Sequence, residues 1–207
     1  PGTQISDNTF AKELAMSRAP IREAILLLQM DGLVQLDANS KVIVAPIRID
    51  DVVDILHVRC ALESESIVQI AAAGWLSKSQ EQELERVHGQ MSSYTQINEA
   101  MNHYFYDDLF HSTLAKYSGN VRICDILERM RLQMQRARWL NVASPGRQEQ
   151  SANEHAAILH AVLQHDSETC IRQMRLHFYN SEQAFRDLLK DKQIKALAYM
   201  INNFFQS

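Results

Sequence analysis

Beyond residue 47, apolar and polar positions alternate with a helical period over most of the chain. In "EHAAILHAVL", for example, Ile158, Leu159 and Val162 fall on one side of a helix. The same spacing predicts helices at residues 50–73, 79–93, 97–118, 121–142, 150–165 and 167–190, with a short one at 193–205. Gly74, Gly119 and the "SPG" of residues 144–146 separate these segments.

The first 47 residues show a different pattern. A short helix is expected over "NTFAKELAM", and a second begins with Ser17 as candidate N-cap and Pro20 in its first turn. The apolar face of the second helix comprises Ile21, Ile25, Leu28 and Met30. Gly32 suits the left-handed residue that ends a helix, and the strand-like runs "LVQLD" and "VIVAP" follow, joined by "ANSK". Helix, turn, helix and hairpin is the order of a winged helix-turn-helix.

These two patterns predict a mainly α protein with two parts. Residues 1–47 form the winged helix-turn-helix with its small β-hairpin, and residues 48–207 form an all-α antiparallel bundle. Pro46 and the following "IRIDD" mark a short linker between them. The scarcity of Gly and Pro, at 6 and 4 residues, also favours helices over turn-rich β architecture.

Charge and cysteine usage narrow the functional classes. The formal charge of −4 means that nucleic-acid binding requires a local basic surface. Cys60, Cys124 and Cys170 are odd in number, far apart and outside any CxxC motif, so we expect free thiols rather than disulfides or a thiolate zinc site. Neither a signal-like start nor an apolar run of about 18 residues is visible, so a cytoplasmic location without a membrane partner is expected.

The second helix of the first part has the features of a DNA-recognition helix. Ser17, Arg18, Ala19 and Arg22 occupy its leading turn, in front of the apolar face. Arg18 and Arg22 are four residues apart and therefore point the same way. One can contact a guanine edge while the other binds a phosphate, or both can be ordinary solvated arginines.

A second candidate site begins with "DDLFH" at residues 107–111. Asp107 and His111 are one helical turn apart and share a face, so they form either a solvated ion pair or half of a metal site. Asp108 offers an alternative pairing with His111, and His103 extends the polar stripe by one turn. His155 and His177 lie on the apolar sides of two later helices. Alone, each such histidine is expected to bond a backbone carbonyl or a buried water; three with one carboxylate suit zinc, nickel, manganese or iron.

The string "SRAPIREAILLLQMDGLV" resembles "SRTPVREAL..L...GLV", which is typical of the GntR superfamily of bacterial transcription regulators. Ala19 replaces the usual Thr, and Asn39, Ser40 and Lys41 replace the usual glycine-rich wing tip. The family's first helix lacks a counterpart, since Pro1 and Gly2 look like the "PG" that normally follows it. The resemblance implies a homodimer on a two-fold operator, with DNA contacts from Ser17, Arg18, Ala19, Arg22 and Lys41.

The remainder resembles the metal-binding FCD domain of the FadR subfamily. "DDLFH", the "EH" of residues 154–155, His177, "FHSTLAKYSGN" and "HVRCALE" carry this likeness, which with the first motif spans nearly the whole chain. It implies the ligands Asp107, His111, His155 and His177, with zinc favoured, and makes the Asp108 pairing less favoured. His57, His88, His160 and His165 match no ligand position.

In this family the metal helps to hold a small carboxylate effector, such as a sugar acid or lactate. Arg59, Arg131 and Arg138 are the candidate effector ligands, because an acid needs cationic partners near the metal. The expected protein is a metabolite-responsive regulator, a repressor that the effector releases from DNA, and not an enzyme. Two alternatives remain open: a metal-dependent enzyme using the His and Asp site, and a metal with a purely structural role.

Overall fold

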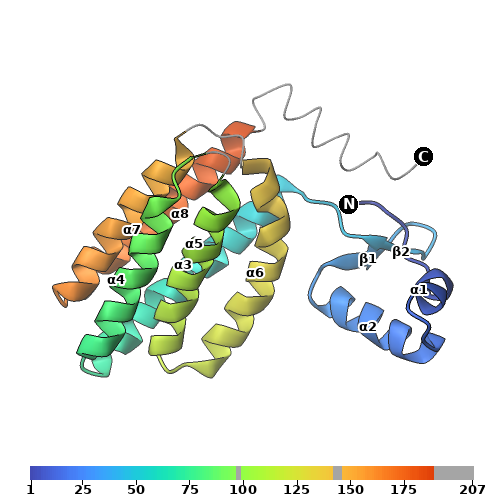
Figure 1. The fold of residues 1–207 in the computed structure, drawn as a ribbon, viewed down its shortest axis with the longest axis horizontal. Coiled ribbons are helices and arrows are strands. Elements are labelled where there is room, and N and C mark those ends of the chain that lie inside the picture. Colours follow the sequence, from blue (N-terminus) through green and yellow to red (C-terminus); the bar gives the residue numbers. More distant parts are fainter. Residues whose placement is uncertain (97–98, 142–145, 189–207) are drawn as a thin grey trace.

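The computed structural model describes residues 1–96, 99–141 and 146–188. In these residues the chain forms eight helices and one two-stranded sheet, arranged as a small N-terminal head and a larger helical bundle (Figure 1). The mainly α fold class is therefore confirmed. The short helix expected at residues 193–205 lies outside the described residues.

The head contains α1 (Asp7–Glu13), α2 (Arg18–Met30), β1 (Val34–Leu36) and β2 (Val42–Val44). Ser17 is the N-cap of α2, and Gly32 ends that helix in the left-handed conformation, with a φ of 70°. The backbone N–H of Gly32 donates to the carbonyl of Gln29 at 3.1 Å, and that of Leu33 to the carbonyl of Leu28 at 2.9 Å. The strands pair antiparallel, with Val34 opposite Val44. This element order is that of a winged helix-turn-helix.

The predicted packing face of α2 is only half correct. Ile21 is buried and Ile25 is half-buried, but Leu28 and Met30 are 38% and 70% exposed. In the described part of the head, α2 packs against α1 and β1. With 7 residues, α1 is shorter than the 13-residue α2, and the later apolar positions of α2 lie uncovered in the described head.

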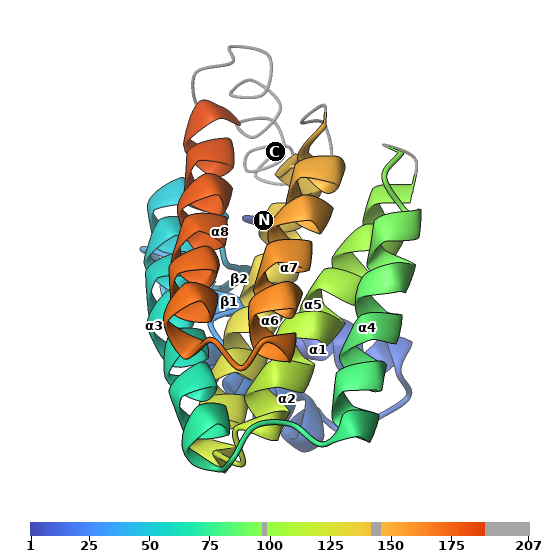
Figure 2. The ribbon, with the colours of Figure 1, turned by 90° about the vertical axis from the view of Figure 1, so that its left-hand side faces the viewer.

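The bundle contains six helices that run up and down beside one another (Figure 2). They are α3 (Ile49–Ala72), α4 (Lys78–Ser93), α5 (Ala100–Tyr117), α6 (Val121–Asn141), α7 (Arg147–Leu163) and α8 (Ser167–Leu188). The helix expected from residue 150 begins earlier, at Arg147, directly after Gly146. In the described residues, no helix is long and apolar enough to cross a membrane.

The core of the bundle follows the helical spacing of the sequence. Its innermost side chains, each less than 3% exposed, include Ile67, Leu84, Met91, Phe110, Leu114, Ile158, Val162 and Met174. Burying one such side chain contributes about 1.5–3 kcal/mol. Cys60, Cys124 and Cys170, all within the described residues, are free thiols as predicted.

Helix α6 lies on the side of the bundle that faces the head (Figure 1). Gln133 Nε2 donates to the carbonyl of Asp31 at 2.8 Å, at the end of α2. The Arg136 guanidinium donates to the carbonyls of Leu33 and Ala45, one on each side of the hairpin. Side chains of α6 therefore attach the head to the bundle through its backbone.

Candidate metal centre

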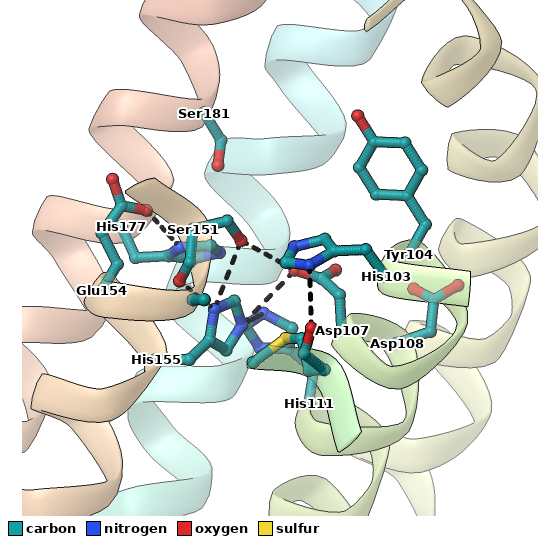
Figure 3. Close-up of polar contacts among 12 residues, drawn as sticks. His103, Tyr104, Asp107, Asp108, His111, Ser151, Glu154, His155, His177 and Ser181 are labelled. Atoms are coloured by element: carbon teal, nitrogen blue, oxygen red, sulfur yellow. Dashed lines mark hydrogen bonds and ion pairs between the residues drawn. The ribbon is translucent and has the colours of Figure 1, made fainter. Parts of the chain in front are cut away.

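Four buried side chains from three helices converge in the bundle and are referred to below as the metal centre. They are Asp107 and His111 on α5, His155 on α7 and His177 on α8 (Figure 3). Their exposures are 7%, 3%, 0% and 4%, respectively. One possible ligand atom from each residue lies within 4.8 Å of those of the other three. The structure thus brings together the four residues that the sequence motifs suggested.

Each imidazole of the metal centre has an acceptor against its Nδ1 atom. For His155 and His177 the distance is 2.7 Å in both cases. The acceptors are the backbone carbonyl of Ser151 for His155, the carboxylate of Glu154 for His177, and the carboxylate of Glu63 for His111. Since carbonyls and ionised carboxylates only accept hydrogen bonds, the proton of each neutral ring resides on Nδ1. The Nε2 lone pairs are then available as ligands.

The remaining atoms of the centre face one another as acceptors. His155 Nε2 lies 3.0 Å from His111 Nε2 and 3.4 Å from Asp107 Oδ1. Neutral rings with Nδ1 protonated cannot hydrogen-bond through two Nε2 lone pairs, so this approach is repulsive without a cation between the atoms. Three imidazole nitrogens and one carboxylate oxygen fit a divalent transition metal such as zinc.

The electrostatics of the centre favour the protonation states that metal binding requires. Burial, reinforced by the neighbouring His177, holds the pKa of His155 well below its ordinary value. Burial also lowers the pKa of His177, although its hydrogen bond with Glu154 opposes that change. For Asp107, burial alone would raise the pKa, but the Arg138 guanidinium outweighs it and leaves the pKa well below the usual range. Neutral imidazoles and an ionised carboxylate are the ligand forms.

Arg138 distinguishes the two adjacent aspartates. Its Nη2 donates to Asp107 Oδ2 at 2.7 Å, so Oδ1 of that carboxylate remains directed at the histidines. Its Nη1 lies 2.6 Å from Asp108 Oδ2. Asp108 therefore belongs to the Arg138 ion pair and lies outside the group of four. His103, the other neighbour on α5, is fully buried with its Nδ1 3.3 Å from the Met91 carbonyl.

The other histidines lie away from the centre. His57 pairs with Glu182 at 2.9 Å on the surface, and His88 Nε2 is 3.1 Å from the Ala152 carbonyl. His165 stacks on Trp75 with ring centroids 5.0 Å apart. His160 is exposed.

A small cavity of about 40 Å³, referred to below as the arginine cavity, adjoins Asp107 and His177. Three buried arginines line it: Arg59, Arg138 and Arg147, at 6%, 6% and 7% exposure. Each is paired with acids of the bundle, at 2.9 Å from Arg59 to Glu63 and 3.1 Å from Arg147 to Glu154. Two of the three predicted effector arginines, Arg59 and Arg138, are thus beside the centre.

Arg131, the third predicted effector arginine, is not part of the arginine cavity but shares a neighbouring cavity with Arg59 and His111. It pairs with Glu128 at 2.6 Å and lines a groove of about 540 Å³ between α5 and α6 and a second cavity of about 270 Å³. The side chains around the arginine cavity do not include it. Arg131 lies two helical turns before Arg138 on the same side of α6, and its side chain is 29% exposed.

Three charged residues of the site received no role from the sequence. Glu63 and Glu154 both belong to sequence motifs of the helical part. Glu154 directly precedes the predicted ligand His155, and this position could have indicated its role. Arg147 had no local signal, because its partners Glu154 and Ser181 are two turns away on α7 and on another helix. Only the packing of α7 against α8 shows that it lines the cavity.

The predicted DNA-contacting residues lie together at the surface of the head. Ser17, Arg18, Ala19 and Arg22 are exposed at the start of α2, and Lys41 is exposed at the turn of the hairpin. Arg18, Arg22 and Lys41 line one groove of about 580 Å³. Helix and hairpin therefore present their basic groups to the same side.

Comparison with known proteins agrees with this architecture. The FCD domain matches residues 54–180. The chain is 26% identical over 198 residues to the HTH-type transcriptional regulator YdhC of Bacillus subtilis, covering 92% of this chain and 85% of that protein. It is 24% identical over 191 residues to the HTH-type transcriptional repressor RspR of Escherichia coli, covering 92% and 83%. The solved structure of E. coli McbR/YncC shares the fold, with a TM-score of 0.74 at 18% identity over 90% of this chain and 88% of that one.

The fold and these relatives define the chain as a DNA-binding transcription regulator of the GntR type. Its helical part belongs to the FCD domain family. The relatives are regulators and not enzymes, which confirms the prediction against an enzymatic role.

Proposed function

We propose that this chain is a homodimeric repressor of the FadR subfamily that senses a small organic acid with the help of a bound metal. Residues 1–47 bind a two-fold operator through Ser17, Arg18, Ala19, Arg22 and Lys41, and residues 48–207 bind metal and acid. The observation that carries the proposal is the convergence of ligand lone pairs directly beside three buried arginines.

Asp107, His111, His155 and His177 hold the metal, for which zinc fits the three-nitrogen, one-oxygen ligand set. When bound, the metal supplies a Lewis-acidic partner for an oxygen atom of the acid. Glu63, Glu154 and the Ser151 carbonyl keep the three rings in the tautomer that binds metal.

The charge balance of the site makes acid binding depend on the metal. The cavity has three arginines, but four carboxylates surround them, from Glu63, Asp107, Asp108 and Glu154. Arg59 and His111 more than offset the effect of burial on Glu63 and hold its pKa at about 2, so this acid remains ionised. Without metal the site has a net negative charge and disfavours an anion. A divalent cation reverses that sign and makes a monocarboxylate a matching ligand.

The size of the cavity indicates how acid binding is communicated to the head. About 40 Å³ has room for a few waters or a carboxylate group but not for a whole sugar acid. Tyr104 and Arg138 line both this cavity and the α5–α6 groove, so the remainder of an acid enters by displacing them. Arg138 is two residues from Arg136, which holds the head. Displacement of Arg138 thus biases α6 and the attached head toward a second arrangement.

Native mass spectrometry of protein purified without chelator tests the first part of the proposal. We expect a dimer mass with one metal ion per chain. Isothermal titration of metal-loaded and chelator-treated protein with lactate and sugar acids tests the second part, and we expect heat of binding only with metal present. Equal acid affinity in both samples would show that the metal is structural.

DNA binding provides the third readout. We expect a bound acid to weaken the complex with operator DNA in an electrophoretic mobility shift titration. If an acid instead tightened the complex, the proposed effect of the acid on DNA binding would be wrong, and the protein would be an acid-dependent DNA binder.

A further inference from the structure

Asp7, the first residue of α1, lies between the two arginines at the start of α2. Its Oδ2 accepts hydrogen bonds from Arg18 Nη2 at 2.8 Å, from Arg18 Nε at 3.3 Å and from Arg22 Nε at 2.7 Å. The Asp7 side chain is 20% exposed, whereas those of Arg18 and Arg22 are 50% and 63% exposed. One carboxylate from the first helix therefore orients both basic groups of the second.

The donor atoms used in these contacts differ between the two arginines. Asp7 engages Arg22 through Nε, and neither terminal amino group of Arg22 donates to the carboxylate. Bidentate recognition of guanine O6 and N7 needs such a pair of neighbouring N–H groups. Arg18 uses its Nε and Nη2 edge on Asp7, so a single terminal group remains for a phosphate.

We propose that Asp7 is a specificity-determining residue, which positions Arg22 to read a guanine and Arg18 to contact the DNA backbone. This inference rests on the proposed DNA binding and adds a residue that does not itself touch DNA. The groove of about 580 Å³ that contains Asp7, Arg18, Arg22 and Lys41 is the surface on which this arrangement acts.

Asp7 has two physical effects on DNA binding, and only the first depends on the DNA sequence. The carboxylate restricts two long side chains before DNA arrives, which reduces the rotamer entropy lost on forming the base contact. It also cancels one of the two positive charges at the start of α2, which weakens attraction to the phosphates of any duplex equally and so leaves the ratio between sequences unchanged. Asp7 thus strengthens binding to the correct sequence relative to any other sequence.

The test compares two DNA duplexes and the full chain with single substitutions. The first duplex is obtained by selection from a random-sequence library on the wild-type protein, and the second is its scrambled version. Fluorescence anisotropy gives Kd for both duplexes. The specificity ratio is the Kd for the scrambled duplex divided by the Kd for the selected duplex. For Asp7→Asn we expect this ratio to fall about tenfold, with tighter binding of the scrambled duplex.

Glu13→Gln is the matched control, because Glu13 is exposed at the other end of α1 and its substitution removes the same charge. We expect this variant to bind both duplexes more tightly by the same factor, so that the ratio of the two Kd values stays the same. Asp7→Glu retains a carboxylate, and we expect it to recover part of the ratio that Asp7→Asn loses.

A double-substitution cycle separates positioning from general stability of the head. Arg22→Lys keeps the charge but cannot form the bidentate contact. If Asp7 acts through Arg22, Asp7→Asn adds no further loss of the ratio to Arg22→Lys. An Asp7→Asn ratio equal to that of the wild type, or additive losses in the double variant, would overturn the role of Asp7. A wild-type chain that enriches no sequence would overturn the DNA binding itself.

Discussion

Replacing Glu63 with Gln tests whether the metal centre depends on fixed histidine tautomers. Glu63 is 3% exposed and lies between two partners. Its Oε1 accepts a hydrogen bond from Arg59 Nε at 2.9 Å, and its Oε2 lies against His111 Nδ1. In the variant, the only remaining oxygen faces Arg59, which can only donate. The amide NH₂ then faces His111 Nδ1 and requires that atom to accept.

This exchange moves the His111 proton from Nδ1 to Nε2, the atom that faces the metal. Loss of a carboxylate that orients a ligating histidine costs 10- to 100-fold in metal affinity, or about 1.4–2.7 kcal/mol. We expect the loss of metal affinity in Glu63→Gln to be about 100-fold, because the amide stabilises the wrong tautomer of His111 rather than leaving the ring free.

Competition between the apo protein and a zinc-chelating dye measures this affinity at neutral pH. Glu65→Gln is the control, since Glu65 lies on the same helix, is exposed and bonds Gln69 at 3.0 Å. We expect the control to bind zinc like the wild type, and circular dichroism to show folded protein in each case. A folded Glu63→Gln variant with wild-type zinc affinity would refute the assigned tautomer.

Other consequences follow from burial and from the α6 contacts. Phe110→Ala removes a fully buried ring that lies against His155 and should cost about 3–5 kcal/mol in urea unfolding. Phe105→Ala, on the same helix but 62% exposed, should change the free energy of unfolding little, and equal losses would contradict the core assignment. Arg136→Ala should leave acid affinity in titration calorimetry unchanged while reducing the effect of the acid on DNA affinity; an undiminished effect would exclude this contact as the link. Burial raises the pKa of Cys170 to about 12, so we expect mass-spectrometric thiol labelling of the native protein at mildly alkaline pH to modify it much more slowly than the half-buried Cys124, with equal rates counting against its burial.

Much of the fold was predictable because its signals are local. The helical period of apolar residues identified the elements of the bundle, and Gly32 and Gly119 mark turns at which the backbone has positive φ. The same local rule failed for Leu28 and Met30, which have the right spacing but lie exposed. Spacing defines a face of a helix, whereas burial also needs an element long enough to cover that face.

The candidate site shows the same division. Asp107 and His111 share a helical face whatever surrounds them, so their spacing alone made them a candidate pair. Their neighbour Asp108 was also a candidate, because it lies one turn before the same histidine. Arg138, on another helix, separates the two aspartates: it pairs with Asp108 and directs Asp107 at the centre.

By itself, the sequence determined the order of elements, the recognition-helix motif and the histidines available for a metal, because each depends on residues within a few turns of one another. Tertiary structure decided what those groups do. Helix packing places an acceptor behind each imidazole, adds Arg147 to the cavity and attaches the head to α6 through Arg136. Such contacts join residues far apart in the chain, so their geometry depends on how the helices pack and not on any local period.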